Sequence, residues 1–216
     1  VNQWLESSNT PFAKLHNEGG INTNPLSPSV FHEAMSAGVV VFEPCGGMCT
    51  FLQAMLRNGW RIRKYFYVDT SPAAQRVARS KLYQLTAEYG RYCPESAWEH
   101  AFTFPDDLNN LTPKMLIDIG IREHLRWVIC SGTPCTGFSR AGKQQGLQDR
   151  HSSLLYVLVK VVKMMQQVAA KSPVYIVENA PVATLEPKFA SSERTPTLVS
   201  ELRGMLGQEV LLDAAQ

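Results

Sequence analysis

The sequence predicts an α/β fold with a doubly wound, mostly parallel sheet. Short apolar runs alternate with longer segments of helical periodicity, which is the pattern of repeated strand–helix units. Several of the strand runs are apolar at every position, as expected for strands covered on both faces. A chain of 216 residues is long enough for one such domain with a substantial core.

The predicted elements follow one another along the chain without an internal repeat. Residues 1–27 are rich in Asn, Ser, Gly, Thr and Pro and predict a loosely ordered arm, which leaves 28–216 for the domain. Pro72 predicts the start of a long helix, because proline is tolerated in a first helical turn. The expected strands are 39–42, 63–68, 101–104, 125–130, 174–177 and 209–212, and the expected helices are 28–37, 48–58, 72–89, 152–170 and 195–205.

The composition is that of an ordinary globular protein, with 44% hydrophobic and 19% charged residues. No uninterrupted apolar stretch reaches the roughly 18 to 20 residues of a membrane span, so no membrane association is expected. An odd number of cysteines without a framework of close spacings favours reduced thiols and an intracellular compartment. No metal site is expected, since Cys45 and Cys49 are not followed by a matching pair at zinc spacing. The net charge of +2 does not by itself indicate a nucleic-acid binder.

Two predicted strands end in residues with chemically reactive side chains. The run 131–139, Ser-Gly-Thr-Pro-Cys-Thr-Gly-Phe-Ser, follows the fourth strand and indicates a presented nucleophile, Cys135, with Pro134 fixing the backbone before it. The alternative is that Cys135 is a small buried hydrophobe. The strand 174–177 leads into Glu178 and Asn179; a Glu at a buried strand end tends to hold its proton near neutrality. The alternative for Glu178 is a helix cap or a surface ion pair.

A glycine turn follows the first predicted strand, in the run Phe42-Glu43-Pro44-Cys45-Gly46-Gly47. A strand, a glycine turn and a helix place backbone N–H groups around a ligand at the strand's carboxyl end. The pattern Gly-x-Gly-x-x-Gly is missing, which argues against a nicotinamide dehydrogenase. Asp69, after the second strand, is placed to accept hydrogen bonds from ribose hydroxyls; alternatively it caps the helix that begins at Pro72.

Together these motifs resemble the cytosine-5 methyltransferases of nucleic acids. In that family Gly-x-Pro-Cys-x-x-Phe-Ser supplies the catalytic thiolate and a Glu-Asn-Val strand end supplies the acid; here the first motif is complete over 132–139 and the second reads Glu-Asn-Ala over 178–180. The strand spacing is closest to the de novo-type DNA methyltransferases. The glycine turn departs from the family pattern, because Pro44 replaces its first glycine.

The resemblance implies S-adenosylmethionine (SAM) as the cofactor. It assigns the adenine amino group to Asp107, with Asp106 as the adjacent alternative and Leu108 as an apolar wall. The segment 146–149 and Leu154 resemble the motif that leads into a helix beside the SAM pocket. The implied cofactor-binding residues are Phe42, Glu43, Gly46, Gly47, Asp69, Thr70, Asp107, Leu108 and Leu154, and the implied catalytic residues are Cys135, Glu178, Pro134 and Asn179.

The expected activity is methyl transfer from SAM to carbon 5 of cytosine in DNA, with the base flipped out of the helix and a covalent adduct on Cys135. Two alternatives stay open: a transfer-RNA methyltransferase with the same motifs, and a catalytically silent methyltransferase-like binding module. The resemblance covers about residues 38–213 and predicts the first part of a catalytic domain, ending before the arginine-rich motif and target-recognition region. It also implies a nuclear location in a eukaryote and allows a homo- or hetero-oligomer.

Overall fold

The computed structural model describes residues 34, 36–135, 154–179 and 204. They fall into two compact units, which are described separately. Residues 34, 36–133 and 161–178 form the sheet unit, and residues 134–135, 154–160, 179 and 204 belong to the second unit. The predicted arm and the strand over 209–212 lie outside the described residues. So do the helices over 28–37 and 195–205, apart from Ala34, Ser36, Ala37 and Gly204, which are helical.

The described elements alternate between strands and helices, as the sequence predicted. In chain order they are β1 (Val39–Pro44), α4 (Thr50–Arg57), β2 (Ile62–Val68), α5 (Pro72–Tyr89), the 3₁₀ helices η1 (Glu95–Ala97) and η2 (Leu108–Asn110), α6 (Pro113–Asp118), β3 (Arg126–Gly132), α7 (Leu154–Val168) and β4 (Val174–Glu178). In the described part of the chain, no helix combines the length and the apolar character needed to cross a membrane.

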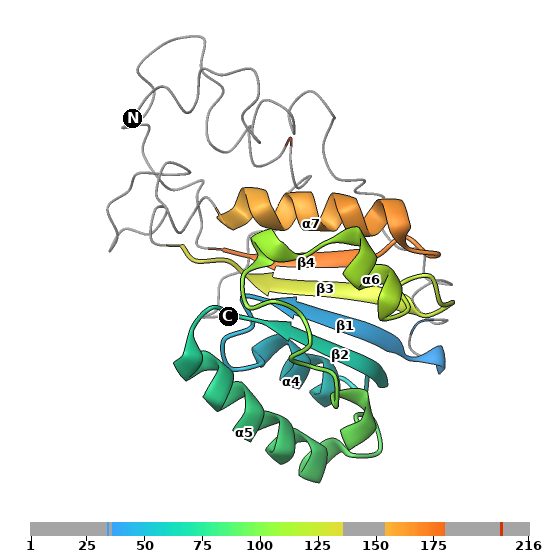
Figure 1. Ribbon diagram of the computed structural model, residues 1–216. Helices are drawn as coiled ribbons and strands as arrows, with labels where there is room; N and C mark the ends of the chain where they lie inside the picture. Colours follow the sequence, from blue (N-terminus) through green and yellow to red (C-terminus); the bar gives the residue numbers. More distant parts are fainter. Residues whose placement is uncertain (1–33, 35, 136–153, 180–203, 205–216) are drawn as a thin grey trace, which may run out of the picture. The chain divides into compact units, whose positions relative to one another are not determined.

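A four-stranded parallel sheet forms the centre of the sheet unit, in the order β2-β1-β3-β4. Figure 1 shows the strands side by side in this order, with α4 and α5 next to β1 and β2. The predicted α/β fold with a parallel sheet is therefore confirmed. The chain runs from β1 outward to β2 and then returns past β1 to β3, so the direction of winding reverses between β1 and β3. In α/β sheets, ligands bind at the carboxyl ends of the strands on either side of this reversal.

The core lies on both faces of the sheet, because alternate residues of a strand point to opposite sides. Val39 and Val41 face one side, where they join the buried residues of α4 and α5 in a single cluster. The aromatic rings of the other side pack around Phe66, whose centroid lies 5.4 Å from that of Trp127 and 5.0 Å from that of Phe104. Both faces of β1 are thus covered, as its apolar run predicted.

The predicted strand over 101–104 is wrong. Ala101 accepts one hydrogen bond from the Tyr67 backbone N–H at 2.8 Å, but the chain then turns, with Thr103 N–H donating to the His100 carbonyl. The segment contributes to the core through its side chains instead, since the Phe104 ring lies 5.4 Å from that of Phe42. An apolar run can therefore fill space beside a sheet without entering its hydrogen-bond ladder.

The predicted helix over 72–89 is confirmed at both ends. Ser71 is its N-cap, with Oγ accepting from the Ala74 N–H at 3.3 Å, and Pro72 stands in its first turn. The predicted strands 39–42, 63–68, 125–130 and 174–177 and the predicted helices 48–58 and 152–170 are present with ends shifted by a few residues. Among the described elements, η1, η2 and α6 have no counterpart in the predictions.

Candidate functional site

The turn between β1 and α4 depends on two glycines for different reasons. A Cβ on Gly46 would lie 2.5 Å from Tyr67 Cε2 and 2.8 Å from the Glu43 carbonyl oxygen, so no side chain fits there. Gly47 has a φ of +49°, a backbone conformation that side chains disfavour, and its missing Cβ would face open space. Pro44 is accommodated because the left-handed residue is not residue 44 but Cys45, with a φ of 57°.

The cofactor turn, defined as residues 44–47, is fastened to β2. Gly46 N–H donates to the Val68 carbonyl at 3.2 Å, and Gly47 N–H donates to Asp69 Oδ2 at 3.1 Å. The Tyr67 hydroxyl donates to the Gly47 carbonyl at 2.9 Å. The backbone of the turn is therefore ordered by contacts within the protein itself.

Asp69 joins the cofactor turn to the start of α5. Its Oδ1 accepts from the Ser71 N–H at 2.8 Å, while Oδ2 accepts from Gly47. The helix cap is Ser71, so the alternative that Asp69 caps this helix is wrong. Asp69 is half-buried and Thr70 is exposed. The ribose contact predicted for Asp69 stays a prediction.

Glu43 points into the core rather than toward the open end of the turn. It shares the face of Val39 and Val41, is 1% exposed, and accepts from Phe51 N–H at 3.2 Å and Leu52 N–H at 3.3 Å. The Tyr65 hydroxyl donates to it at 2.9 Å. Burial raises the pKa of Glu43 to about 7, although these hydrogen bonds oppose the shift. The carboxylate thus supplies the cap that the N-cap residue of α4 lacks.

The role predicted for Glu43, cofactor binding, would therefore involve its backbone. Phe42 is likewise fully buried, with its ring packed against Phe104. Both residues act on the site by fixing the end of β1.

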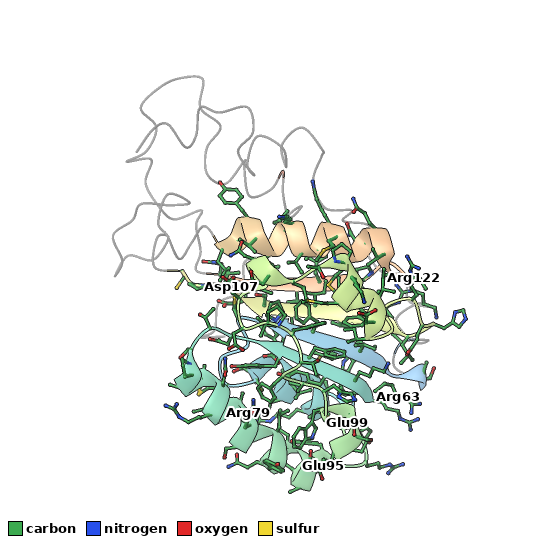
Figure 2. The ribbon with its side chains drawn as sticks, in the orientation of Figure 1. Arg63, Arg79, Glu95, Glu99, Asp107 and Arg122 are labelled. Atoms are coloured by element: carbon green, nitrogen blue, oxygen red, sulfur yellow. The ribbon has the colours of Figure 1, made fainter. Side chains whose placement is uncertain are left out.

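Asp107 lies at the start of η2, where its Oδ1 accepts from both the backbone N–H and the side-chain amide of Asn109 at 2.9 Å. Leu108 beside it is buried, and Asp106 is exposed. Figure 2 shows Asp107 on the side of the sheet where β1 and β3 end, with Arg63 and Arg122 on the opposite side. This position is compatible with the predicted adenine contact, which stays a prediction.

The ends of β3 and β4 bring Gly132 and Glu178 together. These residues form the last pair of the β3–β4 ladder, and a Cβ on Gly132 would lie 3.3 Å from Glu178 Oε2. The carboxylate therefore lies over Gly132. Glu178 is exposed, so the expected burial of this strand end is wrong. The cause is that β4 is only partly covered, with both Ile176 and Glu178 exposed.

Pro134, Cys135 and Asn179 belong to the second unit, where each is half-buried. Leu154, the first residue of α7, is half-buried as well. The rest of the cysteine motif, over 136–139, and residue 180 lie outside the described residues. The catalytic roles assigned to these positions stay predictions.

The other cysteines are poor nucleophiles. Burial raises the pKa of Cys45 to about 11 and that of Cys49, Cys93 and Cys130 to about 12, so these thiols are protonated at neutral pH. Across the described residues, no group of three or more His, Cys, Asp or Glu side chains could hold a metal ion.

Sequence reasoning missed three residues that shape the site: Tyr65, Tyr67 and Ser131. The two tyrosines alternate along β2 and so face the same side as Glu43, which a period-two reading of the strand could have found. Ser131 is a polar residue that ends an apolar run. It is fully buried, and its Oγ donates to the Pro44 carbonyl at 2.8 Å.

A comparison with protein families agrees with the motifs. The family model described as C-5 cytosine-specific DNA methylase matches residues 107–186, from Asp107 through the Pro-Cys loop to beyond Glu178. No curated protein matches the chain. Over residues 107–186 the chain is therefore similar to the C-5 cytosine-specific DNA methylases, the family that its motifs resemble.

Proposed function

We propose that this chain transfers a methyl group from SAM to carbon 5 of cytosine in DNA through a covalent adduct on Cys135. The observation that most directly supports this proposal is the register of β3 and β4, which sets the Glu178 carboxylate over Gly132. Gly132 is three residues before Cys135, and chain geometry limits the distance between their Cα atoms to about 11 Å. A carboxyl group close to the base of the nucleophile's loop supports a shared role in one reaction.

The proposed reaction begins at carbon 6 of the ring. The Cys135 thiolate adds there and forms a C–S bond, while Glu178 hydrogen bonds or protonates the ring nitrogen at position 3. The electron pair displaced from the 5,6 double bond makes carbon 5 nucleophilic. SAM, when bound, supplies an electrophilic methyl group on a sulfonium. Loss of the proton from carbon 5 then re-forms the double bond and expels the Cys135 thiolate.

The residues at the carboxyl ends of β1 and β2 fit the cofactor. Gly47 faces open space, and the backbone of its turn is already ordered. Asp69 offers carboxylate oxygens for ribose hydroxyls. Asp107, at the start of η2, offers an acceptor for the adenine amino group, and the buried Leu108 supports it from behind. We further propose, from the strand spacing, that the protein belongs to the de novo-type branch. The cysteine pattern supports action inside the cell, and the family resemblance supports the nucleus in a eukaryote.

The test is covalent capture of DNA that contains 5-fluorocytosine, in which the adduct is not released because the carbon-5 substituent is fluorine. Cys135→Ser should abolish capture while SAM affinity, measured by calorimetry, stays within about twofold of wild type. Cys93→Ala, which removes a buried thiol elsewhere, should retain capture and serves as the matched control. Capture by the Cys135→Ser variant at the wild-type level would contradict the assignment.

The same assay separates the alternatives. SAM binding by the wild type without capture or methyl transfer would indicate a silent binding module. Capture of 5-fluorocytosine in transfer RNA but not in DNA would indicate an RNA methyltransferase.

A further inference from the structure

We propose that Ser131 is a positioning residue that joins the cofactor turn to the strand leading into Cys135, and that it controls methyl transfer more than thiolate addition. The inference rests on the proposed function. Its basis is where the hydroxyl of Ser131 lies in relation to the β1–β3 ladder.

The backbone pairing between β1 and β3 stops before either strand ends. Its pairs run from Val39↔Arg126 to Phe42↔Ile129, whereas β1 continues for two further residues along β2, as far as Pro44↔Val68. The two central strands thus separate where the winding of the sheet reverses. Beyond that point the fully buried Ser131 Oγ donates to the Pro44 carbonyl at 2.8 Å. A side chain bridges the strands where the ladder has stopped.

The residue after Pro44 in the cofactor turn is Cys45. Burial raises the pKa of its thiol, and the influence of the Ser131 hydroxyl opposes that rise. Cys45 has the left-handed backbone conformation on which the shape of the turn depends. Ser131 therefore holds the turn from the β3 side through Pro44, whereas Val68 and Asp69 hold it from the β2 side.

Ser131 is also next to the chemical end of the site. The following residue, Gly132, lies under the Glu178 carboxylate, and Cys135 is four residues further along than Ser131. In the proposed reaction, Cys135, which follows β3 in the chain, holds the ring, and the turn after β1 holds the donor. Methyl transfer requires the two to meet in line. A misplacement of about 1 Å can slow such a step about 100-fold. Thiolate addition needs no contact with the donor, so a looser join should affect it less.

The experiment measures the two steps separately in Ser131→Ala. Release of tritium from carbon-5-labelled cytosine in DNA without SAM reports addition and reversal at the thiolate. Methyl incorporation at saturating SAM reports transfer, and calorimetry reports SAM affinity. We expect transfer to fall at least about tenfold, with tritium release within about twofold of wild type. Thr112→Ala, which removes the exposed N-cap hydroxyl of α6, should leave both rates unchanged and is the control for hydroxyl loss.

Ser131→Thr keeps the hydroxyl and should restore the ratio of transfer to tritium release. The inference is overturned if Ser131→Ala leaves that ratio at the wild-type value, or if Ser131→Thr loses as much of it as Ser131→Ala. A wild-type protein that neither releases tritium nor transfers methyl groups would instead overturn the proposed function, and the inference with it.

Discussion

The two halves of the sheet edge differ in how completely the protein satisfies its own polar groups. At the ends of β1 and β2, Glu43 and Asp69 each accept at least two hydrogen bonds from the protein, and Glu43 is buried. At the ends of β3 and β4, Glu178 is exposed above Gly132. The first half is organised by contacts within the protein, whereas the second presents an exposed carboxylate. Substitutions on the first side should therefore change stability or cofactor affinity, and those on the second should change rate.

Glu178→Gln should have the largest effect. We expect methyl transfer in a single turnover to fall about 10²- to 10⁴-fold, the range for loss of a general acid. The free energy of unfolding in urea should change by less than about 0.5 kcal/mol, because the side chain is exposed. Glu95→Gln, an exposed Glu on η1, should leave both quantities unchanged. If Glu178→Gln lowered the free energy of unfolding but not the rate of methyl transfer, Glu178 would behave like the residues at the ends of β1 and β2, and the contrast between the two halves would fail.

Gly46→Ala should destabilise the protein by about 3 kcal/mol, because the new methyl group meets the Tyr67 ring in a packed interior. Gly47→Ala should cost only about 1 kcal/mol, since its difficulty is backbone conformation alone. Urea unfolding measures both. Equal losses in the two variants would show that packing against Tyr67 is not what excludes a side chain at Gly46.

Glu43 should make stability depend on pH. Its pKa rises from 4.5 to about 7 in the folded protein, so the folded state binds the proton more tightly. Its contribution is present below pH 4.5 and is lost as the pH rises through 7, by roughly 3 kcal/mol in total. Glu43→Gln should remove this slope and gain stability relative to wild type between pH 5 and pH 8. The measurement is the free energy of unfolding in urea at a series of pH values. If this free energy changed with pH in the same way for both proteins, the role given to Glu43 would be contradicted.

Asp69→Ala should weaken SAM binding by about 1 to 3 kcal/mol through lost hydrogen bonds to the ribose and to Gly47. Asp118→Ala, which removes an exposed partner of Lys114, is the matched control and should bind SAM normally. An unchanged affinity for Asp69→Ala in calorimetry would remove this residue from the pocket.

Local patterns predicted the elements well, and contacts between distant residues were beyond them. The helix from Pro72 could be located because its cap and first turn are adjacent in sequence. The strand over 101–104 could not be rejected, because whether an apolar run joins a ladder depends on its neighbours in space. The buried role of Glu43 depends on Tyr65, 22 residues away. The bridge from Ser131 spans 87 residues, and no local pattern encodes it.

Cys45 and Cys49 flank Gly46 and Gly47, and both adopt the left-handed conformation, with φ values of 57°. For any residue other than glycine this conformation costs roughly 1 to 2 kcal/mol. Cysteine and glycine codons differ by a single base, so a more relaxed backbone is one point mutation away at either position. With cysteine at these two positions, the segment that begins α4 is therefore less stable than the same backbone would be with glycine there.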